Sequence, residues 1–453
     1  MDRLGARVMV ANRNQIELRA VDLEGLLAAD HRARLVWAYV ERLNLSPLYE
    51  QFKAVEGHAG RPGIDPAILL ALWLYATLEG VGSARALARL CEEHDAYRWI
   101  CGGVGVNYHS LADFRVGHGE FLDRLLTTGV ASLMTSGAVT LQRVTQDGVR
   151  VRASAGAPSF RRRPTLERCL AEAKEQVARL RQELDDDPGA TSRRQQAARE
   201  RAACERAERV EQALAELNQI EAMRHQAAKK AERKAAKKAA KQAARQDDEP
   251  QGPGAGSDPP DDDKKRAPRA STTDPEARVM KGPDGGFRAS YNVQFATDAG
   301  AGIIVGVDVT NQGADQGQLS PMGQQLKQRY GRAAQETVVD GGFVTLAEIA
   351  AGDELGTTVY APVPEPKNPD RERYQPLRGD PPAVAAWRVR MGTQEAKDIY
   401  RQRAATAEWA NAQARNRGLR QFAVRGRAKV KAVALLYALA HNLLFGARLA
   451  PTA

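Results

Sequence analysis

The chain has 453 residues, enough for two or three domains, and its 43% of hydrophobic residues suits a globular protein. Its 66 Lys and Arg outnumber its 56 Asp and Glu, and the net charge of +10 favours a polyanionic partner such as nucleic acid. On charge alone, an ordinary enzyme with basic insertions is equally compatible. The four cysteines form no C-x-x-C pair, which excludes zinc spacing of that kind and indicates free thiols in a reducing cytoplasm.

Neither a signal peptide nor a membrane span is expected. The first ten residues lack a signal peptide's apolar core. The most apolar segment, 431–445, is predicted to be too short for a bilayer and is interrupted by His441 and Asn442. We therefore expect a cytoplasmic protein without a membrane partner.

Residues from about 30 to 125 are predicted to form short helices. Asp65 followed by a proline is typical of a helix start, because the carboxylate can accept from a free backbone N–H. The apolar run after it, which Gly80 ends, indicates a buried helix. Ser83 and Ser110 are predicted to cap two further helices. The pattern resembles a helix-turn-helix arrangement, and a plain helical bundle is at least as compatible with it.

A strand and a long helical insertion are predicted next. Residues 138–155 alternate with the period of two that indicates a strand. Apolar residues spaced by four and three then predict a coiled-coil seam, interrupted by a turn at 185–192. We expect an antiparallel helical hairpin inserted into a strand-containing domain. The seam residues are Leu166, Leu170, Ala173, Val177, Leu180 and Leu184, then Val210, Leu214 and Leu217.

The insertion ends in two segments of biased composition. Residues 224–245 are mainly Ala, Lys and Arg without an apolar seam. This indicates a solvated basic helix, or one that forms only when bound to something acidic. Residues 247–270 are rich in Pro, Gly and charge and are predicted to be disordered.

Strands and helices alternate in the remainder of the chain. Their order, together with the first strand, is compatible with a layered α/β domain. Strands are predicted at 290–296, 303–310, 336–340 and 357–363, and helices at 316–330, after 340, at 394–413 and at 426–445.

Two acids stand out by their position. Asp147 lies on the first predicted strand, and Asp340 ends a short apolar strand before a pair of glycines. Phosphodiester chemistry with two metal ions needs convergent carboxylates, and the ends of strands in open sheets are where such sites lie. Each is also an Asp-Gly dipeptide, so a structural turn is the alternative.

A late helix carries a polar face. Tyr400, Glu408 and Arg415 are each about two turns apart and can share one side of a helix. An acid flanked by an aromatic ring and a cation fits a metal ligand beside bound phosphate, whereas a solvated polar face is the alternative. Arg403 and Glu408 are not spaced as an obvious helical ion pair.

Other polar residues are weaker candidates. Asp308 and Asp315 could be accessory metal ligands. The arginines at 161–163 could follow phosphates, or form a solvated cluster. His109 and His441 are single and are expected to be core or capping residues.

From Asp340 on, and across 398–418 (DIYRQRAATAEWANAQARNRG), the sequence resembles the DDE transposases of bacterial insertion sequences. The Tyr, Arg, Glu, Lys signature of that family reads Tyr400, Arg403, Glu408 and Arg415 here, with Arg where the family often has Lys. Arg keeps the charge but alters phosphate geometry. The N-terminal helical module and the last apolar helix are also similar to this family, so the resemblance covers most of the chain.

The resemblance implies a metal-dependent DNA transposase. Asp147, Asp340 and Glu408 would bind two Mg²⁺ ions, which Mn²⁺ could replace, for cleavage at transposon ends and strand transfer into target DNA. Tyr400 and Arg403 would position phosphate or a base near the cut, and Arg415 would contact the DNA backbone. The partner would be DNA in the nucleoid, and two ends imply a homodimer or larger assembly.

The fold class implied is α+β or α/β. A helical N-terminal DNA-binding domain would precede a ribonuclease H-like mixed-sheet domain, which a coiled coil interrupts. The predicted limits are 1–130 for the first, 138–160 with 271–448 for the second, 161–246 for the insertion and 247–270 for the linker.

Three other functions remain open. A ribonuclease H-like nuclease would use the same site without strand transfer. An inactive or domesticated descendant would bind DNA only, although all three acids are present. A structural coiled-coil protein is the third, but the seam is short and lies inside a folded domain.

Overall fold

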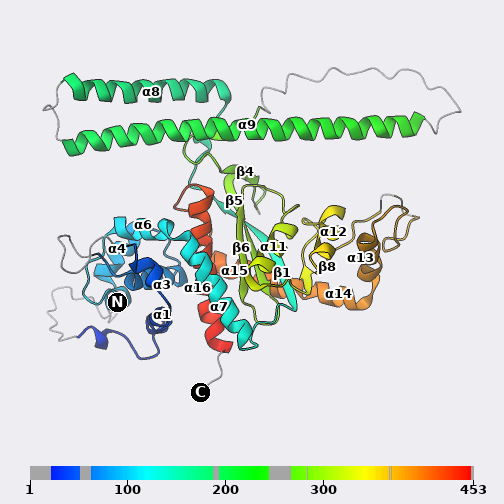
Figure 1. Ribbon diagram of the computed structural model, residues 1–453, viewed down its shortest axis with the longest axis horizontal. Coiled ribbons are helices and arrows are strands. Elements are labelled where there is room, and N and C mark those ends of the chain that lie inside the picture. The colour runs from blue at the N-terminus through cyan, green and yellow to red at the C-terminus, as the bar shows by residue number, and fades with distance from the viewer. Residues whose placement is uncertain are drawn as a thin grey trace, which may run out of the picture. The chain divides into compact units, whose positions relative to one another are not determined.

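The computed structural model describes residues 22–51, 63–186, 193–243, 267–282, 284–366, 368 and 370–449, and it combines helices with a mixed sheet (Figure 1). Two compact units are formed, one within 1–75 and 84–111 and the other within 76–83 and 112–453. The predicted turn at 185–192 begins within the helix α8 (Arg163–Asp186), and the rest of it, like most of the predicted disordered linker, lies outside the described residues. Ala270, which was assigned to that linker, instead begins the short strand β3.

The first unit is helical, as predicted. The helix α3 (Pro66–Leu78) begins where Asp65 Oδ1 accepts a hydrogen bond from the N–H of Ala67, at 2.8 Å. Its buried Trp73 donates from Nε1 to the carbonyl of Leu111, at 2.9 Å. The other helices are α1 (Arg32–Glu41), α2 (Ser46–Tyr49), α4 (Ala84–Glu93), α5 (Asp95–Cys101) and α6 (Tyr108–Gly117).

One predicted cap is wrong. Asn107 precedes α6, and its Oδ1 accepts from the N–H of Ser110 at 2.9 Å. Ser110 therefore lies in the first turn. A capping side chain satisfies an N–H two or three residues further on, so the capping residue is Asn107.

The second unit is built on a sheet of six strands with β1 (Arg143–Arg152) at its centre. On one side β1 pairs antiparallel with β5, and on the other it pairs parallel with β7. The strand β4 was not predicted; it extends the sheet beside β5. The other strands are β4 (Arg278–Lys281), β5 (Phe287–Asp298), β6 (Ile304–Thr310), β7 (Glu336–Val338) and β8 (Thr358–Tyr360).

Helices cover both faces of this sheet. Gln146, Ala296 and Gly306 are directly paired and share one face, on which a Cβ at Gly306 would meet Met322 of α11 (Leu319–Tyr330). The opposite face, to which Asp147 belongs, is contacted by α15 (Trp409–Asn416) and α16 (Arg427–Leu449). The helix α7 (Gly119–Thr135) packs against α16.

Two side-chain amides form hydrogen bonds with the backbone of the edge strand β6. Asn442 of α16 accepts from the N–H of Ile304 and donates to its carbonyl, and Gln325 of α11 does the same at Val307. These bonds replace the partner strand that an open edge lacks. The amide that interrupts the apolar C-terminal segment thus bonds to the sheet.

The helix α16 corrects the prediction on length. It has 23 residues and is long and apolar enough to cross a membrane. However, 61% of its most apolar stretch of 18 residues is buried inside the protein. His441 Nε2 bonds to the carbonyl of Gly302 at 2.8 Å, and its ring packs against Trp409 and Phe445. Such burial is typical of a core helix, and it confirms His441 as a core residue.

We expect His441 to make the protein acid-sensitive. Burial lowers the pKa of this imidazole from 6.5 to about 4, so native stability falls as pH drops from 6.5 towards 4, because the unfolded chain binds a proton that the buried ring does not. The shift corresponds to up to about 3 kcal/mol. His441→Gln keeps a donor for Gly302 but does not titrate, so its unfolding free energy should fall less over this range. Urea unfolding at pH 7, 5.5 and 4.5, followed by tryptophan fluorescence, measures the difference; parallel curves would contradict the assignment.

A second apolar cluster lies beside β7 and β8. Trp387 is fully buried there and donates from Nε1 to the carbonyl of Ala361, at 3.0 Å. It belongs to α13, a helix between 363 and 394, where none was predicted, although proline is favourable in a first turn. The helices of this part are α12 (Leu346–Glu354), α13 (Pro382–Gly392) and α14 (Gln394–Arg401).

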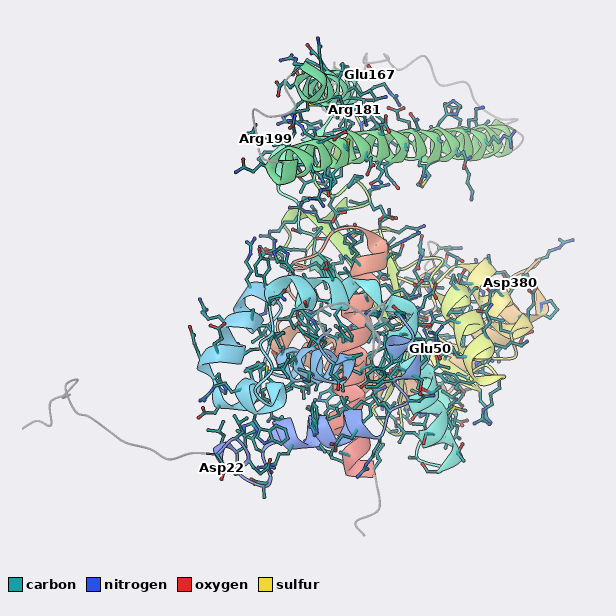
Figure 2. The ribbon with its side chains drawn as sticks, turned by 60° about the vertical axis from the view of Figure 1, so that its left-hand side comes forward. Asp22, Glu50, Glu167, Arg181, Arg199 and Asp380 are labelled. Carbon is teal, nitrogen blue, oxygen red and sulfur yellow. The ribbon has the colours of Figure 1, made fainter. Side chains whose placement is uncertain are left out.

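The insertion contains two long helices, α8 (Arg163–Asp186) and α9 (Arg193–Ala243), which pack against each other. It leaves and rejoins the domain at a pair of short strands, β2 (Phe160–Arg161) and β3 (Ala270–Ser271). The predicted seam residues Leu166, Val210 and Leu217 are buried between the helices. Charged side chains such as Arg181 and Arg199 lie on the surface of the pair (Figure 2). The coiled coil itself stays a prediction.

Candidate active site

Asp147 lies on β1, and Asp340 follows two residues after the end of the neighbouring strand β7. The parallel register pairs Thr145 of β1 with Val338, the last residue of β7, and the charge of Asp340 acts on the carboxyl of Asp147. Neighbouring strands are about 4.8 Å apart, and residues at the same register point to the same face. The two acids that the sequence singled out are therefore adjacent, although 192 residues separate them.

Asp147 is held in a largely buried position. Its side chain is 19% exposed, its Oδ1 accepts from the N–H of Gly148 at 2.9 Å, and its Oδ2 accepts from Nδ2 of Asn411 at 2.9 Å. Burial raises the pKa of this carboxyl to about 6; Arg403 opposes the rise and the neighbouring charge of Asp340 adds to it. A site that holds two acids this close favours a cation.

The guanidinium of Arg403 is a cation beside these acids. Arg403 Nη2 lies 3.0 Å from Oε1 of Glu408, and its Nη1 lies 4.0 Å from Oδ2 of Asp147. Arg403 is 15% exposed, and its buried Nη1 has no hydrogen-bond partner among the residues that the structure describes. The guanidinium thus links the first and third predicted acids electrostatically.

The spacing argument against an Arg403–Glu408 ion pair is wrong, and the backbone gives the reason. The turn η3 (Ala404–Glu408), between α14 and α15, is π-helical, with bonds that span five residues instead of four. Residues five apart therefore lie above each other here, and Arg403 reaches Glu408. π-Helical turns are rare and occur frequently at functional sites.

The arrangement can be tested as a cation site. Among the described residues, no three acidic, His or Cys side chains converge closely enough to hold a metal ion. Glu408 is bound to Arg403, and its side chain is 57% exposed. Asn411 adds a buried Oδ1 that accepts no hydrogen bond in the described part of the chain. Two adjacent carboxylates, an exposed third one and an unused amide oxygen are the hard oxygen donors that Mg²⁺ takes.

Asn411 and Gly148 are the residues that the sequence analysis missed. Asn411 follows Glu408 by one helical turn in an Ala-rich stretch, and this spacing was the available signal. Gly148 leaves room for a carboxylate on the opposite face of the sheet: Asp315 Oδ1, which accepts from Asn292 Nδ2 and Gln294 Nε2 at 2.7 Å.

The other predicted residues lie in different surroundings. Tyr400 is half-buried and packs against the apolar cluster beside β7 and β8, and Arg415 is exposed on α15. Asp315 bonds to β5, on the face opposite Asp147, and Asp308 pairs with Lys431 at 3.3 Å. The roles of Tyr400 and Arg415 in DNA binding stay predictions.

Two family models match the chain, one near its N-terminal end and one near its C-terminal end. Residues 21–116 match the family described as Transposase domain (DUF772), and residues 379–444, which include Arg403, Glu408 and Asn411, match the Transposase DDE domain. The two matches identify the chain as an insertion-sequence DDE transposase. No match was found among curated proteins or among solved structures.

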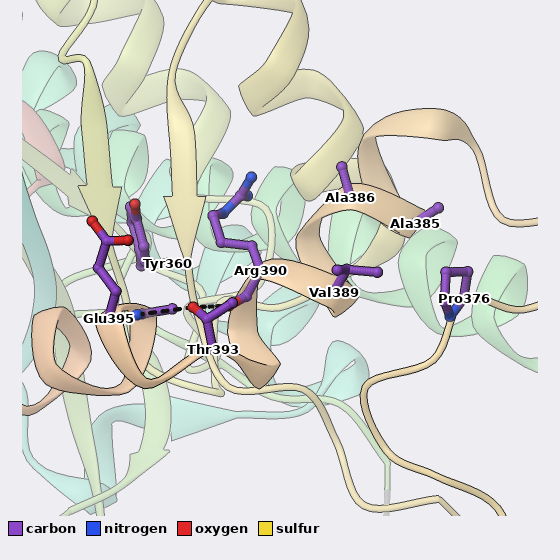
Figure 3. Close-up of a pocket in the computed structure, with 9 residues that line it drawn as sticks. Tyr360, Pro376, Ala385, Ala386, Val389, Arg390, Thr393 and Glu395 are labelled. Carbon is purple, nitrogen blue, oxygen red and sulfur yellow. Dashed lines mark hydrogen bonds between the residues drawn. The ribbon is translucent and has the colours of Figure 1, made fainter.

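The transposase has a cavity that is separate from these acids. It measures about 560 Å³ and lies between α13, α14 and β8 (Figure 3). Arg390 donates from Nη2 to the carbonyl of Val359 at 3.0 Å and lies over the ring of Tyr360, and Thr393 caps α14. Arg390 and Thr393 thus stabilise the local fold. None of the acids predicted to be catalytic lines the cavity.

Removing the Asn411 amide should lower the rate of DNA cleavage without unfolding the protein. Asn411→Leu deletes the donor to Asp147, and losing a partner that orients a metal ligand costs about 10–100-fold in activity or metal affinity. The exposed Asn416→Leu on the same helix is the matched control and should cleave DNA like wild type. Equal cleavage rates for the two variants would show that Asn411 does not orient Asp147.

Proposed function

We propose that this transposase binds the ends of its insertion sequence, cuts them and joins them to target DNA through Asp147, Asp340 and Glu408. The observation that carries the proposal is the adjacency of Asp147 on β1 and Asp340 just after the end of β7. A fold gains nothing from holding two acids together, so the arrangement is best explained by chemistry that needs a cation.

The catalytic domain is proposed to be ribonuclease H-like. Three antiparallel strands, β1, β5 and β6, are followed by the parallel strands β7 and β8, with β1 in the centre. The domain limits given by the sequence, including the helical DNA-binding domain to about residue 130 and the inserted coiled coil, are part of the same proposal.

Each residue would have a distinct role. Asp147 and Asp340 form a fixed pair, and Glu408 completes the set when it turns away from Arg403. Two Mg²⁺ ions, or Mn²⁺ in their place, would supply activation of the attacking oxygen and stabilisation of the leaving one. Asn411 holds the Asp147 carboxylate in one orientation.

The cationic side chains would bind and position the DNA. Arg403 neutralises Asp147 and Glu408 in the metal-free protein, and once Glu408 leaves, its guanidinium can pair with a phosphate. Tyr400 and Arg415 would help to position the DNA. Two transposon ends require at least a dimer, working on DNA at the bacterial nucleoid.

The test separates strand transfer from cleavage alone. Purified protein is incubated with Mg²⁺, a supercoiled target plasmid and a labelled duplex carrying the DNA end that flanks this reading frame. Labelled plasmid is the expected product, and it should be absent with Asp340→Asn. Cut duplex without joined plasmid would indicate a nuclease, and binding without cutting would indicate an inactive DNA-binding descendant; either result overturns the proposal.

A further inference from the structure

The helix α9 is longer than its partner. Ion pairs between α8 and α9 fix an antiparallel register. The last of them, at the first residue of α8, joins Arg163 to Glu221 at 2.6 Å. Beyond Glu221 the helix runs on to Ala243 without α8 beside it, as Figure 1 shows. We call residues 222–243 the α9 extension. The other two pairs are Arg181–Glu200 at 3.0 Å and Lys174–Glu211 at 2.8 Å.

The base of the extension is fixed to the sheet domain. Arg278 of β4 pairs with Glu216, and Leu217 packs with Leu166 and Ala270 in one buried cluster. The extension therefore starts from a rigid point. Its 22 residues correspond to about 33 Å at 1.5 Å per residue.

The extension carries most of the net charge of the chain. It contains eight Lys or Arg and one Glu, a net charge of +7 out of +10. The remaining 431 residues contain 58 Lys or Arg and 55 Asp or Glu, and are nearly neutral. The basic character that suggested nucleic acid is thus concentrated in one helix.

The cations form two rows along the helix. Lys229, Arg233, Lys237 and Lys241 are spaced by four, as are Lys230, Lys234 and Lys238. Residues four apart are neighbours on a helix, so like charges at this spacing in the sequence destabilise an isolated helix. A polyanion that lies along the rows would offset this repulsion.

The described side chains of the extension offer no apolar face on which another protein could pack. Its apolar residues are alanines and Met223, and Met223, Lys229, Lys230 and Arg233 are all exposed. A second copy of the chain would also present positive charge. The occupant must therefore be anionic and must not require apolar burial.

We propose that the α9 extension binds the phosphates of a DNA duplex without reading its sequence. The inference rests on the proposed function and adds to it a binding surface outside the two matched transposase domains. Its length is about that of one turn of B-DNA, roughly 34 Å, and its side chains are Lys and Arg, which contact phosphates. Such contacts raise affinity for any duplex and make it salt-dependent.

The test compares two triple variants of the full chain. Lys229, Lys230 and Arg233 are replaced by Gln in one; in the other, the equally exposed Arg199, Arg201 and Arg206 on the paired part of α9 are replaced by Gln. Binding to a fluorescent 30-base-pair DNA duplex of arbitrary sequence is measured from 50 to 250 mM salt. Circular dichroism checks that helix content is kept.

The first variant should bind about 10–100-fold more weakly near 100 mM salt, and its slope of log K against log salt should fall by about 2 to 3, since each phosphate contact contributes about 0.9. The second should resemble wild type. Equal affinities and slopes for all three proteins would overturn the inference. The inference would also be overturned if the first variant lost affinity only for an RNA duplex or for polyglutamate, each tested in parallel with the DNA duplex. If wild type cuts its DNA end normally, such a failure concerns the extension alone; if wild type neither binds nor cuts DNA, the proposed function fails as well.

Discussion

Asp147→Asn is expected to abolish DNA cleavage and at the same time to stabilise the metal-free protein at neutral pH. The loss of activity should be at least about a thousandfold, or about 4 kcal/mol of barrier, because one of two adjacent carboxylates disappears. The gain in stability follows from the raised pKa of Asp147, about 6 against 3.8 in an unfolded chain. A raised carboxyl pKa means that native stability is full below pH 3.8 and is lost as pH rises through 6.

An Asn side chain avoids that loss because it carries no charge. At pH 7.5 the variant should therefore be more stable by about 1–3 kcal/mol, the upper limit being the free energy that a shift of about two pKa units represents. Near pH 4 the difference should vanish. Asp353→Asn, an exposed acid on α12, is the control and should change neither property. Denaturation at both pH values and a cleavage assay measure the two effects, and a destabilised, inactive Asp147→Asn would contradict this account.

Gly148→Ala is expected to have the largest effect on stability among conservative changes near the site. The new Cβ would collide with Asp315 Oδ1 and lie 2.5 Å from Gln294 Nε2 and 2.6 Å from Asn292 Oδ1. These groups cannot yield easily, because Asp315 accepts from both amides at 2.7 Å. Expelling Asp315 would leave two buried amides unsatisfied, so we expect a loss of about 2–4 kcal/mol.

A matched glycine isolates this cause. Gly129 on α7 has nothing within 4 Å of an added Cβ, so Gly129→Ala should be neutral or stabilising by up to about 1 kcal/mol. Removing the obstacle tests the mechanism: adding Gly148→Ala to Asp315→Ala should cost much less than it does in wild type. Additive losses in urea unfolding would show that the collision with Asp315 is not the cause.

Structural features that depend on residues close together in the sequence could be predicted, whereas features that depend on distant residues could not. The Asp65 cap, the alternating strands and the apolar seam of the insertion follow from neighbouring residues, and they were predicted. The order of strands brought Asp147 and Asp340 into consideration because each lies on or at the end of a strand. Their adjacency, by contrast, depends on the parallel pairing of β1 with β7, which joins distant parts of the chain.

The errors have physical reasons of the same kind. The π-helical turn that pairs Arg403 with Glu408 has no signature in helical periodicity, which assumes 3.6 residues per turn. Asn411 acts through a strand more than 250 residues away, so its position on α15 alone did not reveal it. His441 and Asn442 interrupt an apolar helix because they bond to the turn between β5 and β6 and to β6 itself, partners that the sequence could not identify.

The most direct test of the central claim is Mg²⁺-dependent cleavage of a labelled duplex bearing the element's own end, by wild type, Glu408→Gln and Glu354→Gln. Glu354 is an exposed acid on α12 and serves as the matched control. We predict that wild type and Glu354→Gln cut at the end only when Mg²⁺ is present, and that Glu408→Gln binds the duplex but leaves it intact. Equal cutting by Glu408→Gln would contradict the three-carboxylate site that we assign to Asp147, Asp340 and Glu408.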